Sequence, residues 1–150
     1  MRDAMGGSVV LIIIVMFIVI ALGYMAFNVN YTKAFRMKNK VISVYEEYDG
    51  DCLSECKKKI KDYSKTIGYT SVNGFKCPSG YKQVDNIYCV QEFTTRTMGT
   101  NDVVKEGTTK KYYRIITKIN VEIPIINNIL DLNVFYITGD TKSFEKDLRG

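Results

Sequence analysis

The sequence predicts an α+β fold: one long amino-terminal helix, then a small domain with a short helix and an antiparallel sheet of three or four strands. Two observations support this prediction. An apolar run near the amino terminus passes into an amphipathic pattern, and no proline or charged residue separates the two before Lys33. The second half of the chain is instead rich in β-branched and aromatic residues between turn signals, which is typical of strands.

The apolar run covers residues 8–27, and residues 1–7 form a short tail in which Gly6-Gly7 marks a flexible entry to the helix. About 20 residues with a rise of about 1.5 Å each span the roughly 30 Å hydrocarbon core of a bilayer. A domain of this size has too little material to bury a rod that is apolar on every face. A retained transmembrane helix is therefore favoured. A cleavable signal peptide stays open, since Ala21-Leu22-Gly23 offers small residues for a cut.

Residues 28–48 continue the helix with one apolar face. Apolar side chains recur there at steps of three, four and seven residues, the spacing of one helical face, and Asp49-Gly50-Asp51 supplies the stop. We expect the domain to pack on this stripe, with packing against other copies of the helix as the alternative. The stripe consists of Phe27, Tyr31, Ala34, Phe35, Val41, Ile42, Tyr45 and Tyr48.

The four cysteines, Cys52, Cys56, Cys77 and Cys89, lie in the middle of the domain. The C-x3-C and C-x11-C spacings and the lack of histidine favour disulfides over a zinc site. Cys77 and Cys89 flank a hairpin and suit a direct bridge. Cys52 and Cys56 would pair locally or reach across to the hairpin, because four cysteines allow three connectivities and spacing does not choose among them.

Two rules disagree about the side of the membrane on which residues 49–150 lie. Disulfides place this domain outside the cell. The basic cluster Lys33, Arg36, Lys38 and Lys40 would hold it in the cytoplasm by the positive-inside rule. A very short amino-terminal tail crosses with little charge bias, so we give the cysteines more weight and predict a membrane-anchored protein with an extracellular domain.

A second, shorter helix is predicted over residues 53–66. Ser54 can cap its start, Ile60 and Tyr63 would face inward, and Gly68 follows its end. Its lysines are expected to form a solvated face, with an anionic surface partner as the alternative.

Strand patterns follow this helix. A hairpin is expected around Pro78-Ser79-Gly80 or Asp85-Asn86, then a strand over 87–97 and the strongest strand of the chain over 110–123.

An apolar stretch over 124–132 then suits one or two helical turns, with proline at the first position. A strand over 132–138 and a turn over 139–142 follow. The isoleucines of the apolar stretch would plug the end of the core, with a contact to a neighbouring subunit as the alternative. They are Ile125, Ile126 and Ile129.

The sequence offers little for catalysis or for ligand binding. Histidine is absent, no serine lies in a G-x-S-x-G context, and no P-loop or H-E-x-x-H occurs. Glu46 and Glu47 are consecutive on a helix and so point in different directions. No glycine-rich loop with base-stacking aromatics accompanies the lysines. We expect a protein that is not an enzyme and has no cofactor, metal, small-molecule substrate or nucleic-acid partner.

The architecture resembles the pilin-like proteins of type IV filament systems, in particular the minor pilins of the bacterial tight-adherence (TadE-like) group. The similarity lies in SVVLIIIVMFIVIALGY prolonged through YTKAFRMKNKVISVYEEY, and in the carboxyl-terminal KINVEIPIINNILDLNVFYITGDTK. One departure concerns processing: prepilins of this type carry a glutamate five residues after the leader cut, where a cut between Gly6 and Gly7 would place Leu11. The resemblance implies a structural subunit of a surface pilus, with copies of itself or other pilin-like subunits as partners.

A physical argument leads to the same hypothesis. A helix half in lipid and half striped with aromatics can leave a bilayer only if other copies replace the lipid around it. One helix would then be a membrane anchor before assembly and a packing rod afterwards. The alternative is a solitary single-pass surface protein whose domain binds a partner and never polymerises. The positions expected in the membrane or the filament core are Val10, Ile14, Phe17, Ala21, Tyr24, Phe27, Tyr31 and Phe35.

Overall fold

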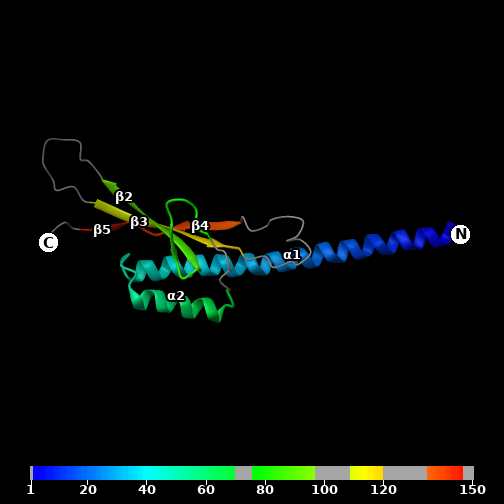
Figure 1. Ribbon diagram of the computed structural model, residues 1–150, viewed down its shortest axis with the longest axis horizontal. Helices are drawn as coiled ribbons and strands as arrows, with labels where there is room; N and C mark the ends of the chain where they lie inside the picture. The colour runs from blue at the N-terminus through cyan, green and yellow to red at the C-terminus, as the bar shows by residue number, and fades with distance from the viewer. Residues whose placement is uncertain (1, 70–75, 97–108, 120–134, 147–150) are drawn as a thin grey trace.

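The computed structural model describes residues 2–69, 76–96, 109–119 and 135–146, and it confirms the predicted α+β architecture. In Figure 1 the sheet packs on the carboxyl-terminal half of α1, α2 runs alongside that same half, and the amino-terminal half of α1 projects beyond both. The elements are α1 (Arg2–Glu47), α2 (Ser54–Thr66), β1 (Lys82–Val84), β2 (Tyr88–Arg96), β3 (Thr109–Lys118), β4 (Tyr136–Asp140) and β5 (Phe144–Lys146).

Helix α1 is unbroken over 46 residues, which corresponds to a length of about 69 Å. It begins at Arg2, ahead of the predicted start at Ser8, and so includes Gly6 and Gly7. Each glycine costs a helix about 1 kcal/mol relative to alanine. Extending a helix that the apolar run has already nucleated costs far less than starting one, and no proline stands in the way. The predicted tail is therefore helical from its second residue.

The carboxyl-terminal end of α1 lies where the stop signal predicts it. Asp49 and Gly50 both adopt positive φ, 48° and 85°, which ends the helical path after Glu47. The Gly50 amide donates to the Tyr45 carbonyl at 2.8 Å. The ring of Tyr113 on β3 lies directly against Gly50: a Cβ there would be only 2.5 Å from Tyr113 Cε2. Glycine is thus required at this turn for both its conformation and its size.

Helix α2 is confirmed, but the predicted serine cap is wrong. The cap position is occupied by Leu53, which makes no side-chain cap hydrogen bond, and Ser54 is already the first helical residue. The helix ends as predicted, with Gly68 at φ 61° and the Tyr69 amide donating to the Ser64 carbonyl at 2.8 Å. Its inward face buries Cys56, Ile60 and Ser64.

The sheet is antiparallel, in the order β1-β2-β3-β4, with β5 also paired to β3. Both predicted turn signals form turns, and the Asp85-Asn86 signal, with φ of 49° and 55°, closes the β1–β2 hairpin. Strands β2 and β3 pair along their whole length, from Tyr88 opposite Thr117 to Arg96 opposite Thr109. This long ribbon is the frame on which the other strands are built.

The last strands differ from the prediction. The turn expected over 139–142 begins two residues later, because Gly139 and Asp140 continue β4, and the short β5 adds a fifth strand that the sequence did not predict. Gly139 faces α1, where a Cβ would lie 2.8 Å from Ile42 Cδ1. This glycine lets the strand approach the helix rather than turn. The apolar stretch with Ile125, Ile126 and Ile129 lies outside the described residues.

The core forms between the second half of α1, α2 and one face of the sheet. The predicted stripe is confirmed for Ala34, Val41 and Tyr45, and the buried face of α1 also includes Met37 and Val44. Partners from the rest of the domain include Ile60, Val84, Tyr88 and Ile115. Full burial of an apolar side chain contributes about 1.5–3 kcal/mol. The second half of α1 is therefore the central element of the domain rather than a stalk attached to it.

Gly50→Ala tests the stop of α1. Alanine at φ 85° with Tyr113 in contact should lower the free energy of unfolding by at least about 1 kcal/mol. Gly7→Ala is the matched control, since nothing lies within 4 Å of its Cβ position and alanine favours the helix. Urea unfolding in detergent, followed by near-ultraviolet circular dichroism of the tyrosines, measures both variants. Equal stability of Gly50→Ala and wild type would contradict this account of the turn.

Candidate functional site: the exposed length of helix α1

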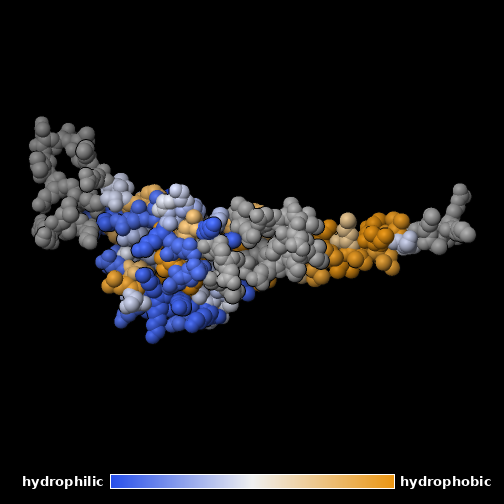
Figure 2. All heavy atoms as spheres, viewed as in Figure 1, coloured by the Kyte–Doolittle hydropathy of each residue, from blue (hydrophilic) through white to orange (hydrophobic). Residues whose placement is uncertain are grey.

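The amino-terminal half of α1 is an uncovered apolar rod. Figure 2 shows it as a hydrophobic projection beyond the largely hydrophilic surface of the domain. Its large apolar side chains from Val9 to Met25 are between 47% exposed, at Val19, and 72% exposed, at Phe17. Contiguous apolar surface of this extent is rare on soluble monomers and marks contact with lipid or protein. The rod must therefore be covered by something other than its own domain.

Length and composition suit this helix to a bilayer. Among the described residues, one helix meets the criteria for a membrane span; it is the stretch Gly6–Glu47, with a mean hydropathy of 3.1 in its most apolar window. A retained anchor and a signal sequence near the amino terminus share these properties. The chain thus has one amino-terminal helix that is able to serve as a membrane anchor or as a signal.

The predicted assembly positions within the rod fall on one face of α1. They follow one another at steps of four and three residues, so their side chains align along the helix. Most are more than half exposed, and none is buried by the domain. These residues are Val10, Ile14, Phe17, Ala21 and Tyr24.

The remaining predicted positions form an aromatic ladder, Phe27, Tyr31 and Phe35, where the rod meets the domain. Successive rings lie 6.3 Å apart with interplanar angles of 27° and 14°. Phe27 is half-buried and meets Phe135 edge to face at 6.1 Å, whereas Tyr31 and Phe35 are 44% and 41% exposed. The expectation that the domain covers the whole stripe is wrong for these two residues. Their exposure prolongs the apolar rod onto the flank of the domain.

The contact with Phe135 was not predictable from the sequence. The two rings come from segments more than a hundred positions apart, and no local pattern links them. At the other end of the ladder, the Lys38 ammonium lies 4.4 Å from the centre of the Phe35 ring. This cation–π contact occupies part of one ring and leaves the remaining aromatic surface open.

Polar contacts, two of them buried, fix the domain to α1. The Thr117 hydroxyl of β3 donates to the Ala34 carbonyl at 3.1 Å, and the hydroxyls of Tyr45 and Tyr88 are 3.2 Å apart. At the end of the helix, the Lys142 amide donates to Glu46 Oε1 at 2.8 Å. Together with the apolar core, these bonds hold the rod in one direction relative to the domain.

Two local disulfides stabilise the domain. Cys52 is bonded to Cys56 and Cys77 to Cys89, so the structure selects the local pairing among the three that the spacing allows. The first bridge ties the loop after α1 to the first turn of α2, and the second ties the segment before β1 to β2. No free cysteine occurs in the described part of the chain. Disulfides persist in oxidising compartments, which is consistent with export of the domain.

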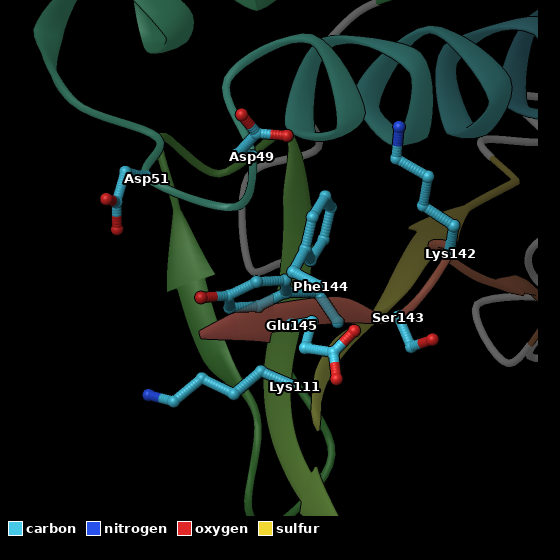
Figure 3. Close-up of a pocket in the computed structure, with 8 residues that line it drawn as sticks. Asp49, Asp51, Lys111, Lys142, Ser143, Phe144 and Glu145 are labelled. Atoms are coloured by element: carbon cyan, nitrogen blue, oxygen red, sulfur yellow. The ribbon is translucent and has the colours of Figure 1, made fainter. Parts of the chain in front are cut away.

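A pocket of about 460 Å³ lies where the end of α1 meets β3 and β5. Figure 3 shows the charged ends of Asp49, Asp51, Lys111 and Lys142 spread around its rim rather than converging on one point. Acid–base catalysis needs such groups within hydrogen-bonding reach of a common atom. Within the described ranges, no group of three or more His, Cys, Asp or Glu residues is placed to hold a metal ion. The charged ends of these four residues therefore do not meet at one atom.

Comparison with protein-family models, with curated proteins and with solved structures finds no match to this chain. The resemblance to TadE-like minor pilins therefore stays a prediction. The exposed rod, the aromatic ladder and the rigid domain are the features of the molecule that bear on function.

Three buried tyrosines link α1, α2 and the sheet. Burial raises the pKa of Tyr69 to about 12, and its hydroxyl donates to the Lys118 carbonyl at 2.7 Å. Burial also raises the pKa values of Tyr45 and Tyr88, which share a hydrogen bond. These phenols keep their protons in the folded state at pH values where the unfolded chain has lost them.

Alkaline pH should therefore destabilise the domain. Between pH 10.0, the ordinary pKa, and about 12, the unfolded state binds fewer protons than the folded state at Tyr69, so stability falls as pH rises. The loss is up to about 1.4 kcal/mol per pH unit for each such tyrosine. Urea unfolding at about pH 8 and about pH 11 measures it. Tyr69→Phe should be less stable than wild type at the lower pH, but its free energy of unfolding should fall less between the two pH values. A wild type that is equally stable at both pH values would contradict this account of the tyrosines.

Proposed function

We propose that this protein is a structural subunit of a type IV-like (Tad-like) surface filament that is anchored in the membrane by α1 and assembles through it. The proposal is supported above all by the exposed apolar rod, which continues into the aromatic ladder without a break in the helix. Neither the disulfides nor the pocket suggests a chemical reaction. The domain supports a mechanical role because it holds the rod in a fixed direction.

The dimensions of the free helix suit two successive environments. Residues 6–33 precede Ala34, the first fully buried residue of α1, and extend for about 42 Å, whereas the hydrocarbon core of a bilayer is roughly 30 Å thick. A chain anchored by residues 8–27 therefore has a further one to two turns between the lipid and Ala34. This extra length holds Tyr31, the middle ring of the aromatic ladder. It is available for contact with a neighbouring subunit even while the rod is in lipid.

Transfer from lipid to a filament core does not rely on the hydrophobic effect, because both surroundings are apolar. Association of such helices depends on van der Waals packing and on contacts outside the lipid. The 3–4 spacing of Val10, Ile14 and Phe17 offers a packing face. Aromatic contacts contribute about 0.5–1.5 kcal/mol per pair beyond their area. The ladder thus gives each subunit a contact that lipid does not already satisfy.

The rigid attachment of the domain determines how subunits can be arranged. Since Thr117, Tyr88 and Lys142 all bond to α1, a domain cannot swing away from its own helix. Packing of the rods therefore places every domain at the same end and in the same orientation. The domains would form the outer surface of the filament on the extracellular side, where the disulfides persist.

Ile14→Asp or Phe17→Asp should abolish filaments. An unpaired carboxylate in a core of packed helices is strongly unfavourable, and even in a bilayer aspartate at the centre of a helix costs about 2.5–3.5 kcal/mol. Leu53→Asp is the matched control, because Leu53 is 73% exposed but lies on the domain. The measurement is the amount of high-mass material in the sheared surface fraction. Normal filaments from the rod variants would rule out assembly through α1.

A second variant separates assembly from anchoring, because aspartate in the rod also weakens membrane insertion. Tyr31→Ala with Phe35→Ala changes only the ladder, and Tyr136→Ala, at a residue 40% exposed on β4, is its control. The ladder variant should remain in the membrane fraction but yield less sheared material than Tyr136→Ala. Membrane-bound protein that never appears in the sheared fraction, even as wild type, would indicate the alternative: a solitary anchored surface protein.

A further inference from the structure

A second surface of α1 faces α2 and forms a groove of about 460 Å³, here named the α1–α2 groove. It lies just beyond the apolar rod, at the end of α2 that is nearest to it. One wall comes from α1 and the other from the last turn of α2 and the residue after it. The lining residues are Asn28, Val29, Thr32, Lys33, Arg36, Thr66 and Ile67.

The groove is cationic. Its lining includes Lys33 and Arg36 and, among these described residues, no carboxylate. Neither cation forms an ion pair within the part of the chain that the structure describes. The Lys33 ammonium donates one hydrogen bond, to the Gly68 carbonyl at 3.3 Å, and so keeps two N–H groups for a ligand. Arg36 is exposed with its guanidinium fork uncommitted.

The hydroxyl groups of the lining are already used as donors. Thr32 donates to the Asn28 carbonyl at 2.8 Å, and Thr66 donates to the Asp62 carbonyl at 3.0 Å. Donors for a ligand therefore come from Lys33, Arg36 and the Asn28 amide. This set suits an anion with several oxygens, and a phosphate group above all.

The order of residues along α1 matches the order of groups in a phospholipid. Val29 lies about 3 Å beyond Phe27 along the axis, Lys33 about 9 Å and Arg36 about 13 Å, at 1.5 Å per residue. With a hydrocarbon core of about 30 Å in a bilayer of about 40–45 Å, the headgroup layer is roughly 5–8 Å deep on each side. The apolar start of the groove thus adjoins the acyl chains. The Cα atoms of its two cations lie outside the headgroup layer, which their long side chains reach because Cα–Cβ bonds in a helix tilt toward its amino terminus.

From this geometry we infer that the α1–α2 groove binds the phosphate of an anionic phospholipid headgroup in the membrane that α1 spans. Val29 and Ile67 contact the lipid next to its glycerol, while Lys33 and Arg36 hold the phosphate. This inference rests on the membrane anchoring in the proposed function. It commits to lipid rather than a soluble phosphate because the lining is apolar where the bilayer begins and cationic where the headgroups lie.

The inference accounts for a conflict in the sequence. Basic residues just after the apolar run predict a cytoplasmic domain, whereas the disulfides predict an exported one. If Lys33 and Arg36 bind lipid phosphate, part of the basic cluster has a role that does not depend on topology. The groove also leaves the aromatic ladder free, since Lys33 is two positions from Tyr31 and thus about 200° around the helix from it. Lipid and a neighbouring subunit would occupy different faces.

The test uses the full-length protein in detergent, titrated with phosphatidylglycerol and measured by native mass spectrometry. Wild type should retain one phosphatidylglycerol, and Lys33→Gln with Arg36→Gln should bind it about 30-fold more weakly, from the contribution expected of two cations near a membrane surface. Lys57→Gln with Lys58→Gln removes the same charge from the exposed face of α2 and should bind as wild type does. Lys33→Arg should retain binding, because it keeps the charge.

Three results would overturn the inference. Equal weakening by the α2 control would mean attraction by net charge rather than a site. Unchanged binding in the groove variant would mean that the groove is not the site. Displacement of the lipid by inorganic phosphate at the same concentration would mean a soluble ligand. Incorporation into nanodiscs of neutral phosphatidylcholine is measured in parallel: failure to insert would contradict the anchor itself, whereas insertion with unchanged lipid binding would contradict the groove alone.

Discussion

Packing of the second half of α1 against α2 and the sheet is the interaction on which the rest of the structure depends. Met37, Val41 and Val44 are completely buried in this interface, and Thr117 bonds to the backbone of the same helix. Because α1 has no break, the direction fixed there is transmitted to the whole rod. The large apolar side chains from Val9 to Met25 remain 47–72% exposed, and apolar surface of this extent marks contact with lipid or protein.

Most of the fold could be predicted because most of its signals are local. An apolar run, a 3–4 spacing and a stop at Asp49-Gly50 define α1, and β-branched residues define the β2–β3 ribbon. The turn predicted at Gly139 was wrong. A glycine is needed there because Ile42 of α1 approaches the strand closely, and not because the chain turns. Strand β5 was missed because three residues carry almost no pattern. Periodicity likewise gives the stripe on α1 but not how far the domain extends along it, which is why Tyr31 was expected to be covered.

The candidate functional surfaces likewise include some that the sequence predicts and others that depend on the tertiary structure. The rod is visible in the sequence, because composition alone marks a span of this length. The pairing of Cys52 with Cys56 is determined by the tertiary structure, since the spacing leaves three connectivities open. Lys33 and Arg36 were visible as charges but were interpreted only through topology. Their groove forms because α2 ends beside them in the tertiary structure. The sequence places Val29, Lys33 and Arg36 on one face of α1 but does not show that α2 lies next to that face.

The central claim is that the mature protein keeps its apolar helix and exports its disulfide-bonded domain. The most direct test is the intact mass of the protein from its native membrane or surface fraction, before and after reduction and thiol labelling. The account predicts a chain that is full length or trimmed near Gly6, gaining four hydrogens as the two disulfides open. A chain beginning near Tyr24 would show that the rod is a discarded signal, and four free thiols before reduction would place the domain in the cytoplasm; either result would contradict the account.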